Sequence, residues 1–125
     1  MLGSLVLLAT LLVFGDMANT KALSTARAST ENVDDTITYL LDHVAKSDCA
    51  FIRNGQVHTG LEASVHFKAK YDHFKPEIKT PEDFIRLTAT KSLITGTAYL
   101  VKPLTGPAIP CADWLGQALA DYRKR

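Results

Sequence analysis

The stretch Ser47–Tyr71, SDCAFIRNGQVHTGLEASVHFKAKY, decides the fold, because it holds a tight turn followed at once by a helix start. Asn54-Gly55 lies between two short β-prone runs. Both central positions of a two-residue hairpin turn need a positive φ, which Asn and Gly adopt most readily. We therefore expect a β-hairpin whose second strand is Gln56–His58. In its first strand Phe51 and Arg53 point to the same face, because side chains alternate along a strand.

A helix follows this hairpin directly. Thr59 with Glu62 three residues later has the form of a capping box, in which each side chain bonds the other residue's backbone N–H. Pro76 ends the helix, since proline lacks the N–H that a continuing helix needs. The inner face of this helix carries Ala63, Phe67, Lys70, Tyr71 and Phe74.

Three further helices flank this stretch. Apolar residues at helical spacing predict one from about Thr30 to Ser47. Thr80 as cap and Pro81 at the first helical position predict another, ending near Lys91. The last begins at about Cys111. Their inner residues are Val33, Ile37, Leu40, Leu41 and Val44, then Phe84, Ile85, Leu87 and Thr88, then Trp114, Leu115, Ala118, Leu119 and Tyr122.

One later strand completes the predicted elements. A Thr95-Gly96 turn enters a strand at Ala98–Lys102, Pro103 prevents further pairing, and a loop follows up to the last helix. The order is helix, hairpin, helix, helix, strand, helix. It predicts an α+β fold in which about four helices pack on a small antiparallel sheet, made of the β-hairpin plus one later strand.

The N-terminal segment has a different composition. Leu5–Phe14 is almost wholly apolar and uncharged, too short to span a bilayer but suited to the apolar core of a secretory signal. Ala26 and Ala28 provide small residues before a cleavage point. We predict a signal peptide at residues 1–28 and a single compact α+β domain at residues 29–125. A buried N-terminal helix and a retained membrane anchor are the alternatives.

The charge balance limits the classes of partner. Without residues 1–28 the chain has 12 basic and 12 acidic residues, so its net charge is zero. A nucleic-acid-binding protein needs a basic excess on one face. Adhesion to anionic lipid needs one as well. We therefore expect no nucleic acid as partner and no stable membrane insertion after signal cleavage.

Two cysteines, Cys49 and Cys111, are present. Small exported domains often add a disulfide to a marginal core. A Cys49–Cys111 bridge would close a loop of about 60 residues and contribute roughly 4 kcal/mol. Two buried free thiols are the alternative.

The polar residues around the hairpin suggest three kinds of site. His58, Glu62 and His66 lie close in sequence, but a closed metal site needs three or four converging ligands, so we expect no metal and no cofactor. A hydroxyl at Ser92 or Thr95 with His66 as base would suit a hydrolase, but no GxSxG elbow or orienting acid is visible.

The third kind of site is an anion-accepting groove. His66 and Lys70 are four residues apart and present two donors on one helix face, and Arg53 on the hairpin is placed to join them. Ser92 and Thr95 would lie across the groove as hydrogen-bond partners. The alternative is that Arg53 pairs with an acid such as Glu62 and that Lys70 is merely solvated.

The motifs CAFIRNG, EASVHFKAKY, TPEDFI, ATKSLITGTAYLV and ADWL, in this order over about residues 31–122, resemble the YfeK-like family of small exported bacterial proteins of unknown function. Leu93 stands where the family usually has a serine, and the family's usual GKPY reads Gly96-Thr97-Ala98-Tyr99 here, so its lysine is missing. The resemblance implies export, with a periplasmic or secreted location, and a compact α+β domain. It implies no activity. The residues that match are Phe51, Arg53, Asn54, Gly55, Glu62, Ala63, His66, Lys70, Tyr71, Phe84, Ile85, Lys91, Ser92, Thr95, Gly96 and Tyr99.

These observations favour a non-enzymatic binding or interaction module whose ligand is a small anion or an unknown envelope partner. Its predicted ligand-binding residues are Arg53, His66, Lys70, Ser92 and Thr95. One alternative is a small envelope hydrolase that uses His66 with a nearby hydroxyl. The other is a structural, partner-binding protein without a ligand site.

Overall fold

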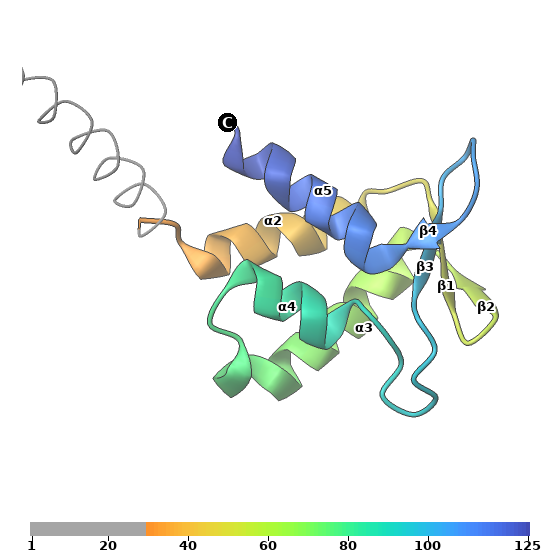
Figure 1. The fold of residues 1–125 in the computed structure, drawn as a ribbon, viewed down its shortest axis with the longest axis horizontal. Helices are drawn as coiled ribbons and strands as arrows, with labels where there is room; N and C mark the ends of the chain where they lie inside the picture. The colour runs from red at the N-terminus through yellow and green to blue at the C-terminus, as the bar shows by residue number, and fades with distance from the viewer. Residues whose placement is uncertain (1–29) are drawn as a thin grey trace, which may run out of the picture. The chain divides into compact units, whose positions relative to one another are not determined.

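The computed structural model describes residues 30–125, which contain four α-helices and a four-stranded antiparallel sheet (Figure 1). This arrangement confirms the predicted α+β class. None of the helices in this part of the chain is both long and apolar enough to cross a membrane. The predicted signal peptide, residues 1–28, lies outside the described residues. The helices are α2 (Val33–Ala45), α3 (Gly60–Phe74), α4 (Pro81–Thr88) and α5 (Cys111–Arg123), and a short 3-10 helix, η1 (Lys75–Glu77), follows α3.

The sheet has the spatial order β2-β1-β3-β4. Its strands are β1 (Ala50–Arg53), β2 (Gln56–His58), β3 (Leu100–Lys102) and β4 (Ile109–Pro110). The hairpin β1–β2 is confirmed, with Asn54 at φ 52° and Gly55 at φ 77° in its turn. Strand β3 comes from far along the chain and pairs with the other side of β1, so the hairpin's first strand is central.

The predicted capping box of Thr59 and Glu62 is formed, and the predicted cap Thr80 forms a second box with Asp83. Thr59 N–H donates to Glu62 Oε1 at 3.0 Å, and Glu62 N–H donates to Thr59 Oγ1 at 3.2 Å. Thr80 and Asp83 make the same exchange at the start of α4, where Pro81 is the first helical residue. Each box satisfies backbone donors that the first turn of a helix leaves without partners.

Several boundaries differ from the sequence-based expectation, and β3 begins at Leu100 and not at Ala98. Helix α4 ends at Thr88, because Thr90 Oγ1 donates to the Ile85 carbonyl at 2.8 Å and the chain then turns away. The segment predicted as a loop after β3 ends in the two-residue strand β4. It lies at the edge of the sheet, where the missing N–H of Pro110 is tolerated.

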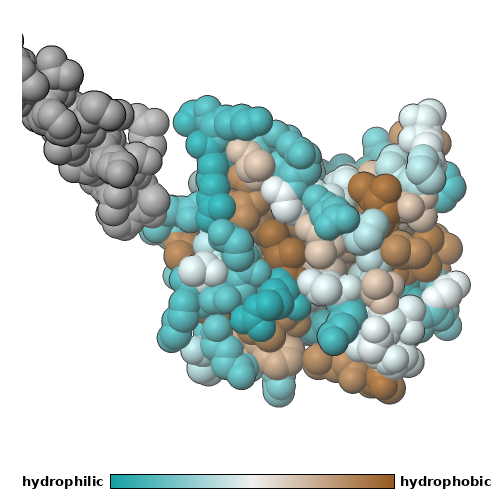
Figure 2. All heavy atoms as spheres, viewed as in Figure 1, coloured by the Kyte–Doolittle hydropathy of each residue, from teal (hydrophilic) through white to brown (hydrophobic). Residues whose placement is uncertain are grey.

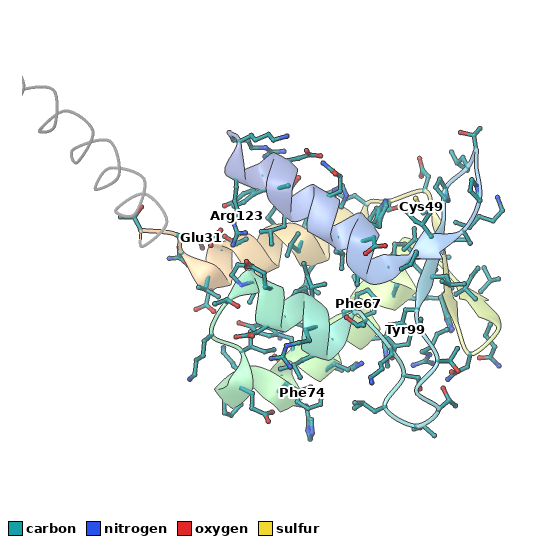
Figure 3. All side chains as sticks on the ribbon, in the orientation of Figure 1. Glu31, Cys49, Phe67, Phe74, Tyr99 and Arg123 are labelled. Atoms are coloured by element: carbon teal, nitrogen blue, oxygen red, sulfur yellow. The ribbon has the colours of Figure 1, made fainter. Side chains whose placement is uncertain are left out.

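The core lies between the helices and one face of the sheet (Figure 1). Helix α3 contacts β1, and α5 contacts β3 and β4. Figure 3 shows Phe67 of α3 and Tyr99, just before β3, beside one another where the helices meet the sheet. The fully buried apolar side chains include Ile37, Leu40, Val44, Phe84, Val101, Leu115 and Cys111.

Gly60 allows a close approach of two helices. It is the first residue of α3, where the chain passes over the C-terminal end of α2. A Cβ at this position would overlap the carbonyl oxygen of Val44 and lie 2.9 Å from that of Ser47. No larger residue therefore fits unless the backbone moves.

The predicted Cys49–Cys111 disulfide is not formed, and both residues are free cysteines. The sheet register gives the reason. Cys49 precedes Ala50, which pairs with Lys102, so it lies level with the residue after Lys102. Cys111 donates its N–H to the Tyr99 carbonyl at 2.8 Å. Cys49 is therefore level with Pro103 and Cys111 with Tyr99, and these two positions are four residues apart, about 13 Å along the strands. A disulfide needs Cα atoms within roughly 7 Å of one another.

Candidate functional site

A small pocket lies between α3 and the sheet. Its volume is about 70 Å³, well below the roughly 300–1,000 Å³ of drug-sized ligand sites. It therefore suits a ligand of a few heavy atoms, or one group of a larger molecule. The lining residues are Phe51, Ile52, Arg53, His58, Glu62, Ala63, His66, Phe67, Tyr99 and Leu100.

Arg53 and His66 both line this pocket and lie in contact, as the sequence predicted. Strand β1 brings Arg53 to the face of the sheet that α3 covers, and Arg53 Nη1 lies 3.0 Å from Nδ1 and 3.2 Å from Nε2 of His66. His66 Nε2 lies 3.1 Å from the Tyr99 hydroxyl. A guanidinium only donates. A neutral His66 that accepts from Arg53 and donates to Tyr99 therefore satisfies all three groups.

Lys70 lies behind the pocket wall, one helical turn beyond His66. It is buried, with 8% of its surface exposed. Its Nζ donates to the Lys91 carbonyl at 3.1 Å and to the Tyr99 hydroxyl at 3.3 Å. The ammonium also lies 4.9 Å from the centre of the Tyr99 ring. Tyr99 is thus the group that His66 and Lys70 share.

The cluster of Arg53, His66, Lys70 and Tyr99, called the basic cluster below, has no acidic partner. Among residues 30–125, no carboxylate forms an ion pair with Arg53 or Lys70. The alternative in which Arg53 pairs with Glu62 is therefore not what forms. Glu62 caps α3 and faces His58, with Oε2 at 3.9 Å from His58 Nδ1.

The cluster's electrostatics follow from burial and from this unbalanced positive charge. Burial lowers the pKa of His66, and the charges of Arg53 and Lys70 lower it further. Burial, followed by the charge of Arg53, lowers the pKa of Lys70. Burial raises the pKa of Tyr99, with the charge of Arg53 acting against it. His66 and Lys70 thus both disfavour their positively charged forms, and His66 is held neutral at pH 7.

Ser92 and Thr95 do not line the pocket. Thr95 Oγ1 donates to Asn54 Oδ1 at 2.6 Å, and Asn54 Nδ2 donates to Ser92 Oγ at 3.4 Å. Ser92 Oγ also accepts from the backbone N–H groups of Ile94 and Thr95. The two hydroxyls therefore fasten the loop between α4 and β3 to the hairpin turn, beside the basic cluster.

Sequence reasoning missed three contributors to the site. The sequence indicates Tyr99 only as a family match, Phe67 only as a core residue and His58 only as a candidate metal ligand, whereas all three line the pocket. Period-2 alternation places His58 on the face of the sheet that also carries Phe51 and Arg53, so that signal was available. Within residues 30–125, no three His, Cys, Asp or Glu side chains converge as a metal site would require.

The fold and the pocket define a small α+β protein with an uncompensated basic cluster beneath one helix. The chain belongs to the DUF5329 family, a family of unknown function whose model matches residues 31–123. It is similar to the uncharacterized protein YfeK of Salmonella typhimurium, with 41% identity over 54 residues, which are 43% of this chain and 45% of that protein. The match thus spans less than half the length of that curated relative. No solved structure matches the chain.

Proposed function

We propose that this chain is an exported, non-enzymatic binding module whose pocket accepts the anionic group of a small ligand or of an envelope partner. The observation that supports it is the basic cluster, in which Arg53 and Lys70 have no carboxylate partner among residues 30–125. Burying cations without a counter-charge is costly, and an incoming anion offsets that cost. Lys70 and Arg53 can only donate, so the cluster has more donors than acceptors.

Arg53 is the residue that an anion would contact directly, because it lines the pocket whereas Lys70 does not. Hydrogen bonds to a charged group contribute about 1.5–3 kcal/mol each. Replacing Arg53 with Gln is therefore expected to weaken the binding of acetate and of inorganic phosphate by at least about tenfold. NMR titration of the backbone amides of β1 and α3, in a buffer low in chloride, measures this change.

The matched control is Arg86→Gln, which removes an exposed arginine that pairs with Asp83 on α4. It should bind both anions as the unmodified chain does. Arg53→Lys, which keeps the charge, should retain part of the affinity. Equal binding by Arg53→Gln and the unmodified protein would contradict the proposed function.

Export is the second part of the proposal, with the periplasm or the outside of the cell as the location. It is supported by the apolar run Leu5–Phe14 and the small residues Ala26 and Ala28 before Ser29. Expression of the full chain in a Gram-negative host should yield an envelope fraction whose first residue is Ser29. Mass spectrometry of the intact protein checks this. A chain that keeps Met1 and stays with the cytosolic fraction would refute export.

The two alternative functions, a small hydrolase and a partner-binding protein without a ligand site, receive unequal support. A hydrolase would need a carboxylate behind His66, but the contacts that orient its ring come from Arg53 and Tyr99. A partner-binding role is favoured by the loop between α4 and β3, where Leu93 and Ile94 are 65% and 94% exposed. This loop lies at the lower edge of the molecule in Figure 1, and Figure 2 shows hydrophobic residues on the surface there. The loop is held by Ser92 and lies beside the hairpin turn, so a partner that covers it would also approach the pocket.

A further inference from the structure

The pocket between α3 and the sheet is largely apolar. The apolar and aromatic residues of its lining are Phe51, Ile52, Ala63, Phe67, Tyr99 and Leu100. Atoms beside an unfilled space lose the dispersion contacts that a neighbour would supply, and apolar cavities take up apolar molecules. An apolar group therefore fills this pocket best.

Arg53 lines the same pocket and supplies the charge that an anionic group needs. Only its Nη1 has a partner among residues 30–125, the ring of His66. A guanidinium has five N–H groups, so those of Nη2 and Nε remain for a ligand. Arg53 is half-buried, so part of it stays in contact with water. An anionic group can therefore reach it without entering the apolar interior.

Glu62 determines the orientation of a bound acid. Hydrogen bonds from the backbone and side chain of Thr59 lower the pKa of Glu62, so it is a carboxylate at pH 7 and repels a second one. His58 beside it offers no nitrogen to a ligand, because Nε2 is buried and Nδ1 faces Glu62 Oε2 at 3.9 Å. The carboxylate of a ligand therefore lies at Arg53, and the rest of the ligand lies in the apolar interior.

The volume of the pocket limits the length of the ligand. A cavity of about 150 Å³ holds benzene, which is about 25 Å³ for each carbon. The volume of about 70 Å³ found here therefore holds about three carbons. A carboxylate carbon at the rim, beside Arg53, brings the total to about four.

We propose that the ligand is a short-chain monocarboxylate of about four carbons, with butyrate as the model compound. Its carboxylate binds Arg53, and its alkyl chain fills the pocket. The inference rests on the proposed function, because it uses the anion site at Arg53 and adds the chemical class of the ligand.

The test measures the effect of chain length by NMR titration of the full chain with formate, acetate, propionate, butyrate and hexanoate. Each buried methylene should tighten binding about fourfold, which is about 0.8 kcal/mol. Butyrate should therefore bind about fifteenfold more tightly than acetate. Hexanoate should bind no more tightly than butyrate, because the cavity is then full.

The amino acid β-alanine tests whether the interior of the pocket is as apolar as its lining indicates. It has as many heavy atoms as butyrate but ends in an ammonium group. We expect it to bind at least about tenfold more weakly than butyrate, because a charge buried in apolar surroundings without a partner is costly. If β-alanine bound as tightly as butyrate, the inference would be wrong.

A substitution that fills the pocket tests where the alkyl chain lies. Ala63→Leu adds three carbons at the wall of the pocket, about the number that the pocket holds. This variant should bind every acid of the series about as weakly as the unmodified chain binds formate. The matched control is Ala69→Leu, which makes the same change at an exposed position of α3 and should leave butyrate binding unchanged. A folded Ala63→Leu chain that still prefers butyrate to acetate would contradict the inference.

The remaining outcomes separate this inference from the proposed function. Equal affinity for acetate and butyrate would overturn the inference and leave the anion site standing. Failure of both acids to bind would overturn the inference and the proposed function together.

Discussion

Replacing Phe84 with alanine is expected to lower the free energy of unfolding by about 4 kcal/mol, within the usual range for a buried Phe→Ala change. Phe84 is fully buried, and its ring meets that of Tyr71 edge-on, with centroids 5.7 Å apart. The substitution leaves a cavity between α3 and α4 as well as removing buried apolar surface. Urea unfolding followed by circular dichroism measures the loss, as a midpoint lower by about 2 M if the slope is about 2 kcal/mol per M.

The control for this prediction is Leu93→Ala, on the loop between α4 and β3, where the side chain is 65% exposed. An exposed substitution of this kind should change the free energy of unfolding by no more than about 0.5 kcal/mol. A loss below about 1 kcal/mol for Phe84→Ala would mean that Phe84 does not pack as described.

Gly60→Ala is expected to cost about 3 kcal/mol, although alanine usually favours a helix. The added methyl group meets the carbonyl oxygen of Val44, which belongs to the backbone of α2 and cannot rotate away. The start of α3 and the end of α2 would have to separate. The same urea experiment measures this loss.

Gly116→Ala is the matched control, because Gly116 also lies within a helix, α5, and a Cβ there meets nothing within 4 Å. This variant should be more stable than the unmodified chain, by up to about 1 kcal/mol. If Gly60→Ala and Gly116→Ala changed the free energy of unfolding in the same direction, the contact with Val44 would not be what restricts the side chain at residue 60.

The local elements were predictable because their signals lie within a few residues. The turn at Asn54-Gly55 and the capping box of Thr59 with Glu62 each depend on neighbours in sequence, and both formed as predicted. The sheet order was not predictable in the same way. The pairing of β1 with β3 joins Ala50 to Lys102, and no local pattern specifies which distant strand enters or at what register.

The same distinction between local and non-local contacts decides which residues of the site could be predicted. Arg53 and His66 came together as expected, because the hairpin runs directly into α3 and fixes their relative position. Tyr99 reaches the site, and Ser92 the hairpin turn beside it, only through the non-local pairing of β3 and the folding back of its preceding loop. The disulfide prediction was wrong for a related reason, since the spacing of two cysteines in sequence gives no information on their distance in a sheet.

The position of α5 bears on which part of the chain is needed for folding. Its thirteen residues come after all the other described helices and strands in sequence. Leu115, Ala118 and Leu119 on this helix form part of the buried core, and the helix touches α2, α4 and two strands. A nascent chain that lacks them has an incomplete hydrophobic interior and one side open to water. A chain cut before Cys111 is therefore expected to stay largely unfolded, and circular dichroism of residues 30–110 alone measures this.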